Sequence, residues 1–182
     1  MISNKINNGI NGDIKIPADK SISHRSLIIP SISNGVSEIS NLLLSDDVFH
    51  TLNAFRNLGI KITNEDNKFQ IFGKGLKKLT KPKKNIYLGN SGTSARLLTG
   101  LLASQNFISV LEGDASLSSR PMSRIMEPLK SMGAEFDNIS GKLPLKIIGK
   151  KLNKSKIEID IPSAQIKSGL MLAAINTDGK TE

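Results

Sequence analysis

The chain has 182 residues, 38% of them hydrophobic and 23% charged, which is the balance of a folded globular protein and excludes an intrinsically disordered one. It contains no cysteine and two histidines, which excludes disulfides and thiol nucleophiles and argues against a zinc site. Its 25 basic and 16 acidic residues give a net charge of +9, which suits anionic partners: nucleic acid, membrane headgroups or phosphorylated metabolites.

The predicted elements begin with a unit of the order βαβαββ. A polar turn and an apolar helix follow its first strand, and its second helix carries Val48, Leu52 and Phe55 at i, i+4 and i+7. We expect Ser45 to cap this second helix and Gly59 to end it. The strands of the unit are predicted at residues 14–16, 35–39, 60–63 and 68–73.

The same order recurs along the chain. A lysine-rich stretch, residues 73–84, is expected to be a solvated loop, and the helix that Pro121 opens carries the stripe Ile125, Leu129 and Met132. A third copy supplies one strand and one helix before the last residue. The further strands are predicted at residues 86–89, 107–111, 134–137, 144–149 and 159–161. We therefore expect an α+β fold of βαβαββ units at residues 10–80, 81–152 and 153–182, with two units complete and the third truncated.

One basic residue marks the first helix of each unit. Arg25, Arg96 and Lys167 stand at equal intervals of 71 residues, which is unlikely to arise by chance. Four positions before each lies a small turn residue: Ser21, Gly92 and Ser163. A strand that enters a Gly/Ser turn and then a helix N-terminus presents backbone N–H groups and a positive dipole to an anion. Three such turns related by a repeat are therefore a candidate site for a ligand with several negative charges.

Candidate ligand-binding side chains lie in and beside these turns. Lys20 supplies a mobile charge for acid–base work, Ser21 a hydroxyl donor and Arg25 a rigid bidentate fork. The alternative is that Ser21 is only a helix cap and Arg25 a surface charge. Arg120, held by Pro121 near the positive end of a helix, is costly there unless an anion is bound. Arg124 is expected to be solvated, and both histidines are expected to be structural.

Four stretches in register resemble the 5-enolpyruvylshikimate-3-phosphate synthase family: DKSISHRS, LGNSGTSARLLTG, GDASLSSRPMSRIMEPLKSMGA and IPSAQIKSGLMLAA. The resemblance runs from about residue 10 to the last residue and covers about the first two-fifths of the family's usual length. It implies two globes of three βαβαββ units each, the inside-out α/β barrel of the enolpyruvyl transferases, joined by a two-stranded hinge. Residues 1–16 would then be a strand of the second globe plus hinge, and residues 17–182 most of the first globe.

The resemblance also implies residue roles. Lys20 would contact both substrates and take part in proton transfer. Shikimate-3-phosphate would be bound by Lys20, Ser21, Arg25, Ser163, Ala164 and Gln165. Phosphoenolpyruvate would be bound by Lys20, Gly92, Arg120 and Gln165. The family often has a second serine where Ala164 stands, so a contact there must come from the backbone. Glycine at position 92 leaves room for glyphosate, which occupies the phosphoenolpyruvate site in this family, and we expect the full-length enzyme to be sensitive.

The implied reaction transfers the enolpyruvyl group of phosphoenolpyruvate to the 5-hydroxyl of shikimate-3-phosphate, in the pathway to chorismate and the aromatic amino acids, without cofactor or metal. The implied partners are these two small molecules and the missing C-terminal globe. The resemblance implies binding to neither nucleic acid nor membrane, and a full-length enzyme that is a monomer. Because the family's acidic residues for proton transfer lie in the second globe, we expect this chain alone to be inactive. With no signal or transit pattern at the start and apolar runs too short to cross a bilayer, we expect a cytoplasmic protein.

Three alternatives stay open. The related transferase acting on UDP-N-acetylglucosamine usually has Asn after the lysine and often a cysteine acid, whereas this chain has Ser21 and no cysteine. RNA 3′-phosphate cyclase shares related units but lacks the DKSISHR and GDASLSSRPM patterns. A basic nucleic-acid-binding module would fit the net charge, although six Phe, one Tyr and no Trp provide few platforms for stacking bases.

Overall fold

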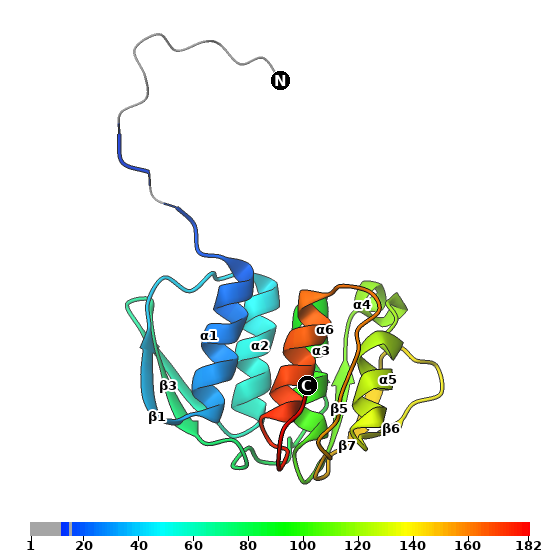
Figure 1. The fold of residues 1–182 in the computed structure, drawn as a ribbon. Helices are drawn as coiled ribbons and strands as arrows, with labels where there is room; N and C mark the ends of the chain where they lie inside the picture. Colours follow the sequence, from blue (N-terminus) through cyan, green and yellow to red (C-terminus); the bar gives the residue numbers. More distant parts are fainter. Residues whose placement is uncertain (1–11, 15) are drawn as a thin grey trace, which may run out of the picture.

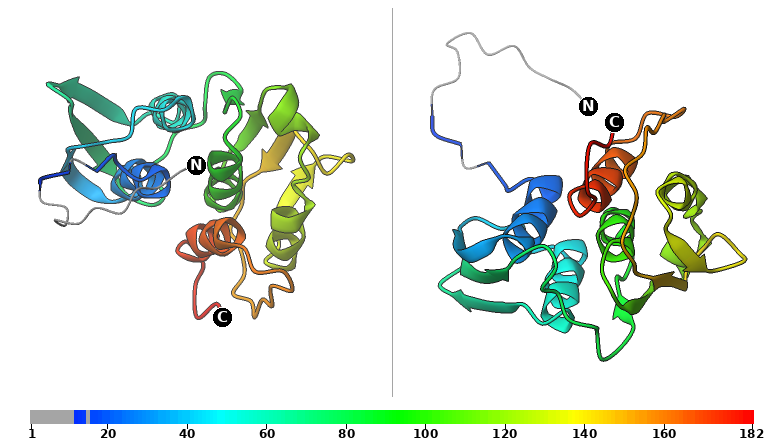
Figure 2. Two further views of the ribbon diagram at one scale, coloured as in Figure 1. Left: turned by 90° about the horizontal axis from the view of Figure 1, so that it is seen from above. Right: turned by 60° about the horizontal axis from the view of Figure 1, so that its bottom comes forward.

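The computed structural model describes residues 12–14 and 16–182 and places two separate β-sheets around a group of helices (Figures 1 and 2). The helices are α1 (Lys20–Ile32), α2 (Asp46–Asn57), α3 (Gly92–Ala103), α4 (Ala115–Ser119), α5 (Ser123–Ser131) and α6 (Ala164–Ala174). The strands are β1 (Asn34–Ile39), β2 (Lys61–Glu65), β3 (Lys68–Lys74), β4 (Ile86–Tyr87), β5 (Ile108–Glu112), β6 (Glu135–Asp137) and β7 (Leu145–Ile148). None of the helices described in these ranges is long and apolar enough to cross a bilayer.

The two sheets repeat one topology, which confirms the predicted repeat. The first has the order β1-β3-β2 and is antiparallel throughout, with Val36 opposite Phe72 and Ile62 opposite Ile71. The second has the order β4-β5-β7-β6, so that β5, β7 and β6 pair as β1, β3 and β2 do. In addition β4 pairs with β5 in parallel, with Ile86 opposite Leu111. The α+β fold of βαβαββ units is thus confirmed, most completely in the second unit.

The strand predicted at residues 159–161 is wrong. Residues 151–163 follow an irregular path, and the helix α6 comes next. In the second unit the corresponding strand, β4, is held by β5. In the third unit only Glu182 lies in that place: its N–H donates to the carbonyl of Ser155 at 3.0 Å and its carbonyl accepts from the N–H of Ile157 at 2.7 Å. One residue gives two hydrogen bonds and no ladder, so the segment has too few partners to form a strand.

The assignment of residues 1–16 to a second globe falls largely on residues outside those described, namely 1–11 and 15. The strand predicted at residues 14–16 is not formed by the two of its residues that are described. Ile14 and Ile16 lie in irregular backbone, and 82% and 76% of their respective surfaces are exposed. Neither has a neighbouring strand to pair with in the described structure.

The helical stripes predicted from the periodicity form the core between the sheets. The stripes of α2 and α5 are buried, and Gly59 and Gly133 end their helices at φ +84° and +90°. The prediction for Ser45 is wrong in part: it occupies the N-cap position of α2, but its hydroxyl makes no capping hydrogen bond. The short helix α4 was not predicted, and the prediction that Pro121 opens the next helix is wrong, since α5 begins at Ser123 with Met122 at its N-cap position.

Helices α3 and α6 approach each other at backbone contact. A Cβ atom on Gly100 would lie 1.9 Å from the carbonyl oxygen of Gly169, and a Cβ atom on Gly169 would lie 2.8 Å from the carbonyl oxygen of Arg96. Real side chains do not tolerate such separations, so both positions require glycine. This close packing sets the first turn of α6 against the first turns of α3.

Candidate functional site

A cleft opens where the N-termini of several helices converge. Figure 1 shows α1 and α6 running in the same direction, with their first turns at the same end of the molecule. The cleft has a volume of about 440 Å³ and is lined mainly by polar side chains from α1, α2, α3, α5 and α6 and the segments before them. Its lining residues are Lys20, Asp47, Asn90, Gly92, Thr93, Arg96, Arg120, Arg124, Ser163, Gln165 and Ile166.

The first side of the cleft comes from α1 and α2. Asp19 caps α1, its side chain accepting from the N–H of Ile22 at 2.7 Å, so the helix begins at Lys20. The Nζ of Lys20 donates to Oδ2 of Asp47 at 3.1 Å, and Asp47 itself lies in the first turn of α2. The lysine is half-exposed, so this ion pair leaves the ammonium group accessible from the cleft.

The floor of the cleft is the first turn of α3. Ser91 caps the helix, and its Oγ accepts from the N–H of Ser94 at 3.2 Å. Gly92 has no side chain to cover the turn, and a Cβ atom there would lie 2.7 Å from Nη1 of Arg96 and 3.3 Å from Nη1 of Arg120. Glycine therefore keeps open the space between two guanidinium groups.

Arg96 is the cation nearest the centre of the cleft. Its Nη1 donates to the carbonyl of Gly92 at 3.0 Å and to Oε1 of Gln165 at 3.2 Å. Burial lowers the pKa of Arg96, and the positive charges of Arg120 and Arg124 lower it further. A guanidinium that is partly desolvated beside two others is stabilised when an anion occupies the space among them.

Arg120 forms the next wall and is held by hydrogen bonds on two sides. Its Nη2 donates to Oδ1 of Asn90 and, at 3.2 Å, to Oγ of Ser116. Arg124, one turn into α5, lines the same cleft from an exposed position. It was expected to be an ordinary solvated residue; it is solvated, yet it adds its charge to this cleft.

The remaining side belongs to α6. Ser163 caps the helix through a hydrogen bond from the N–H of Ile166 at 3.4 Å. Gln165 bridges α6 to α3, because its Oε1 accepts from Arg96 and its Nε2 donates to Oγ1 of Thr93 at 3.0 Å. The side-chain amide of Gln165 thus orients the guanidinium group of Arg96 and is oriented by it.

The charge of the cleft is strongly unbalanced. Four cations face one carboxylate, that of Asp47, which is already paired with Lys20. Helix N-termini add partial positive charge from α1, α3 and α6. A concentration of positive charge of this kind is suited to anions that carry several charges. Among the described residues no group of three or more His, Asp or Glu side chains is placed to hold a metal ion.

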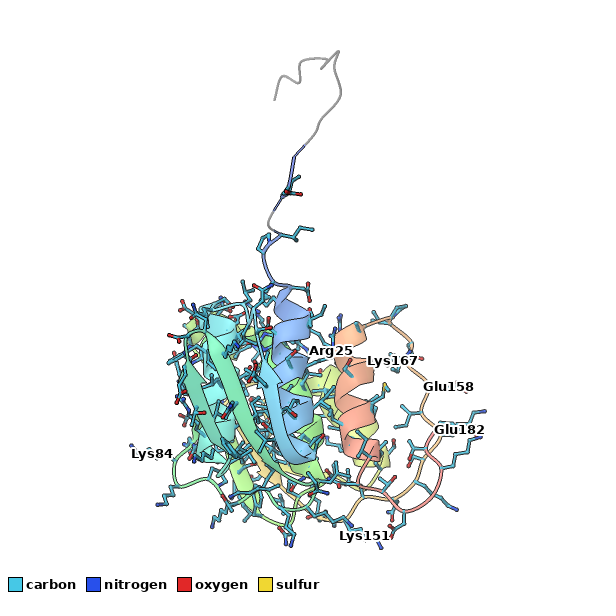
Figure 3. The ribbon with its side chains drawn as sticks, turned by 90° about the vertical axis from the view of Figure 1, so that its left-hand side faces the viewer. Arg25, Lys84, Lys151, Glu158, Lys167 and Glu182 are labelled. Carbon is cyan, nitrogen blue, oxygen red and sulfur yellow. The ribbon has the colours of Figure 1, made fainter. Side chains whose placement is uncertain are left out.

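Five of the eight predicted site residues are brought together. Those that line the cleft are Lys20, Gly92, Arg120, Ser163 and Gln165. The other three, Ser21, Arg25 and Ala164, are exposed and lie beside the cleft rather than in its lining. Figure 3 shows Arg25 on α1 and its repeat counterpart Lys167 on α6.

The cleft also contains residues that received no role from the sequence. Arg96 was noticed only as a member of the 71-residue series, and this recurrence was the signal that could have placed it in the site. Asp47, in the first turn of α2, was given no role. Asn90 and Thr93 flank Gly92, and nothing in their residue types alone indicated a position in the cleft.

The lysine-rich stretch lies away from the cleft. Its lysines are exposed, as predicted, and Lys84 lies toward the opposite end of the molecule (Figure 3). The cleft's positive charge is therefore distinct from the charge of this loop.

The comparisons with known proteins agree with this architecture. Curated relatives named 3-phosphoshikimate 1-carboxyvinyltransferase include one from Leuconostoc citreum, 49% identical over 176 residues, which are 95% of this chain and 41% of the relative. One from Lactiplantibacillus plantarum is 46% identical over 170 residues, 93% of this chain and 39% of the relative. The solved structure of EPSP synthase from Acinetobacter baumannii matches with a TM-score of 0.90 and 41% identity, over 93% of this chain and 39% of that one. The chain thus spans about two-fifths of the length of these proteins.

Repeated βαβαββ units with a cationic cleft at their helix N-termini define a protein with a site suited to small anions. More particularly, the profile of the EPSP synthase (3-phosphoshikimate 1-carboxyvinyltransferase) family matches residues 5–182, and the chain belongs to that family.

Proposed function

We propose that this chain forms one side of an active-site cleft that transfers the enolpyruvyl group of phosphoenolpyruvate to the 5-hydroxyl of shikimate-3-phosphate. The observation that carries the proposal is the convergence of Lys20, Arg96 and Arg120 on one cleft with a single paired carboxylate. Both substrates are small and carry phosphate, and phosphoenolpyruvate adds a carboxylate. Membership of the family supplies the reaction class.

On this proposal each side of the cleft takes one substrate. Phosphoenolpyruvate lies over Gly92 and Arg120, where the glycine leaves space between two guanidinium groups, and Lys20 and Gln165 reach both substrates. The first turn of α6 and the outer face of α1 take shikimate-3-phosphate, through Ser21, Arg25, Ser163, Ala164 and Gln165. Since Ala164 has no polar side chain, only its backbone N–H can contribute there.

The proposed chemistry is addition followed by elimination. The 5-hydroxyl oxygen forms a bond to C2 of phosphoenolpyruvate, its proton leaves to a base, and C3 gains a proton. The hydrogen then leaves C3, the C2–O bond to phosphate breaks, and the enolpyruvyl ether remains. Lys20 is the proton-transfer group of this chain, and the arginines hold the reacting atoms close and stabilise the phosphate that departs.

The partner of the chain, on the same proposal, is the second globe of the fold, and the complete enzyme is a monomer of the cytoplasm. The cleft contains one carboxylate, and that group already neutralises Lys20. The acids for the remaining proton transfers must then come from elsewhere, so we expect the 182-residue chain to bind substrate without turnover.

Calorimetric titration of the chain tests the proposal. Shikimate-3-phosphate should bind saturably, whereas shikimate, which lacks the phosphate, should bind at least about tenfold more weakly, because a charge-assisted hydrogen bond contributes about 1.5–3 kcal/mol. Equal affinity for the two would contradict the proposal. Salt-dependent binding of an RNA hairpin, undiminished by shikimate-3-phosphate, would favour the nucleic-acid alternative instead.

A further inference from the structure

A buried polar cluster lies directly beneath the cleft, formed by His24, Thr51, Ser91 and Ser94. All four are fully buried, and they come from α1, α2 and the start of α3. The Nδ1 of His24 lies 2.8 Å from Oγ1 of Thr51, which lies 2.6 Å from Oγ of Ser94. That hydroxyl lies 2.6 Å from Oγ of Ser91. A continuous chain of hydrogen bonds therefore links three helices.

The second ring nitrogen of His24 decides the direction of this chain. Nε2 is buried and has no hydrogen-bond partner among the described residues. An unpaired buried N–H is more costly than an unpaired acceptor, which favours the tautomer with its proton on Nδ1. The imidazole then donates to Oγ1 of Thr51, and the single hydroxyl proton of Thr51 is shared between Oγ of Ser94 at 2.6 Å and the carbonyl oxygen of Asp47 at 3.3 Å.

His24 is neutral in this setting. Burial lowers its pKa from 6.5 to about 4; Asp47 opposes this shift, and the charges of Lys20 and Arg25 add to it. A second cation next to Lys20 would compete for Asp47, the only carboxylate in the cleft. The ring therefore acts as a hydrogen-bond donor.

Each member of the cluster stands close in sequence to a residue of the cleft. His24 lies one helical turn after Lys20, and Thr51 lies one turn after Asp47. The Oγ1 of Thr51 is also 3.3 Å from the carbonyl oxygen of Asp47. On α3, Ser91 and Ser94 enclose Gly92 and fix the start of the helix. The hydrogen bonds between the helices therefore connect the turns that line the cleft.

We propose that His24 is a positioning residue, which through Thr51 and Ser94 holds the turns of Lys20, Asp47 and Gly92 in the arrangement that binds anions. The inference rests on the proposed function for the identity of the anion. The proposal differs from the view that His24 only fills space in the core. On that view, an apolar side chain of similar volume would support anion binding equally well. The hydrogen bond from Nδ1 is the feature that the two views treat differently.

Two variants of the 182-residue chain separate these views. His24→Asn keeps an amide donor near the place of Nδ1, whereas His24→Leu keeps apolar volume and removes the donor. Titrated with shikimate-3-phosphate, His24→Leu should bind about tenfold or more weakly than wild type, and His24→Asn within about threefold, because only His24→Leu leaves Oγ1 of Thr51 without its donor. Thr99→Val is the matched control, because Thr99 is fully buried and its hydroxyl bonds only within α3, to the carbonyl of Ala95. It should lower stability and leave affinity unchanged.

Affinity in His24→Leu equal to wild type would overturn the proposal, as would equal loss in all three variants. A second measurement does not depend on the ligand. Long-range ¹H–¹⁵N NMR spectra should show the proton of His24 on Nδ1, and the Gly92 amide resonance should shift in His24→Leu but little in His24→Asn. A proton on Nε2, or an unmoved Gly92 resonance, would end the positioning role. If wild type binds no shikimate-3-phosphate, the proposed function fails, and the spectra still decide the role of His24.

Discussion

Gly100→Ala tests the backbone contact that sets α6 against α3. The added Cβ atom would lie 1.9 Å from the carbonyl oxygen of Gly169, so the helices must separate by more than 1 Å to restore an ordinary contact of about 3.3 Å. Overpacking of this kind costs about 1–3 kcal/mol, and we expect the upper end because both atoms belong to backbone. The better helix propensity of alanine returns about 1 kcal/mol. The net loss is about 2 kcal/mol.

Gly92→Ala on the same helix is the control, because its Cβ atom would meet side chains rather than backbone. These are the ends of Arg96 and Arg120, which can move aside, and Cδ1 of Leu117 at 3.9 Å, which is an ordinary contact. Thermal and urea unfolding, both followed by circular dichroism, measure the two variants. Gly100→Ala should lower the melting temperature by about 4–8 °C, and Gly92→Ala should change stability by less than about 1 kcal/mol. A Gly100→Ala chain as stable as wild type would refute the backbone contact and, with it, the placement of Gln165 beside Arg96.

Three further predictions concern the cleft and its support. Gly92→Ala should weaken the binding of phosphoenolpyruvate, and that of glyphosate more strongly, because the methyl group occupies the space between Arg96 and Arg120. Equal inhibition by glyphosate of the full-length enzyme with and without the substitution would contradict this steric explanation. Arg96→Lys should weaken substrate binding about tenfold, measured by calorimetry, because lysine keeps the charge but lacks the planar guanidinium fork, which bonds Gly92 and Gln165 through Nη1 and leaves donors for an anion. Since the pKa of His24 falls to about 4, the unfolded chain takes up a proton below pH 6.5 while the folded chain does not. The free energy of unfolding, measured in urea titrations, should therefore fall by up to about 3 kcal/mol as the pH falls from 6.5 to 4. This loss should be absent in His24→Asn. A wild-type free energy that does not change with pH would contradict the burial of a neutral ring.

Local patterns of apolar residues in the sequence were enough to predict most of the helices and strands. Strands of alternating apolar residues and helices with an i, i+4, i+7 stripe lie within one or two residues of the places expected, as with the stripe of α2. The strand at residues 159–161 failed for a non-local reason. Its pattern is that of a strand, but a strand forms only beside a partner, and the backbone hydrogen bonds of Glu182 go to Ser155 and Ile157 rather than to residues 159–161.

The site was predictable to the extent that the repeat marks it. The recurring turns indicated Gly92 and Ser163, and the electrostatic cost of an arginine near a helix N-terminus indicated Arg120. Asp47 and Asn90 could not be found in this way, because their places in the cleft follow from how the units pack together. Arg124 shows the same limit: its exposure was foreseen, but not which surface it would face.

The central claim is that three turns, far apart in sequence, form one anion site. The most direct test is titration of the ¹⁵N-labelled chain with shikimate-3-phosphate, followed by amide resonances along the backbone. We predict that the largest shifts fall together, with one dissociation constant, at residues 20–21, 92–93 and 163–165. Shifts confined to a single turn, or centred on the lysine-rich residues 73–84, would contradict the account.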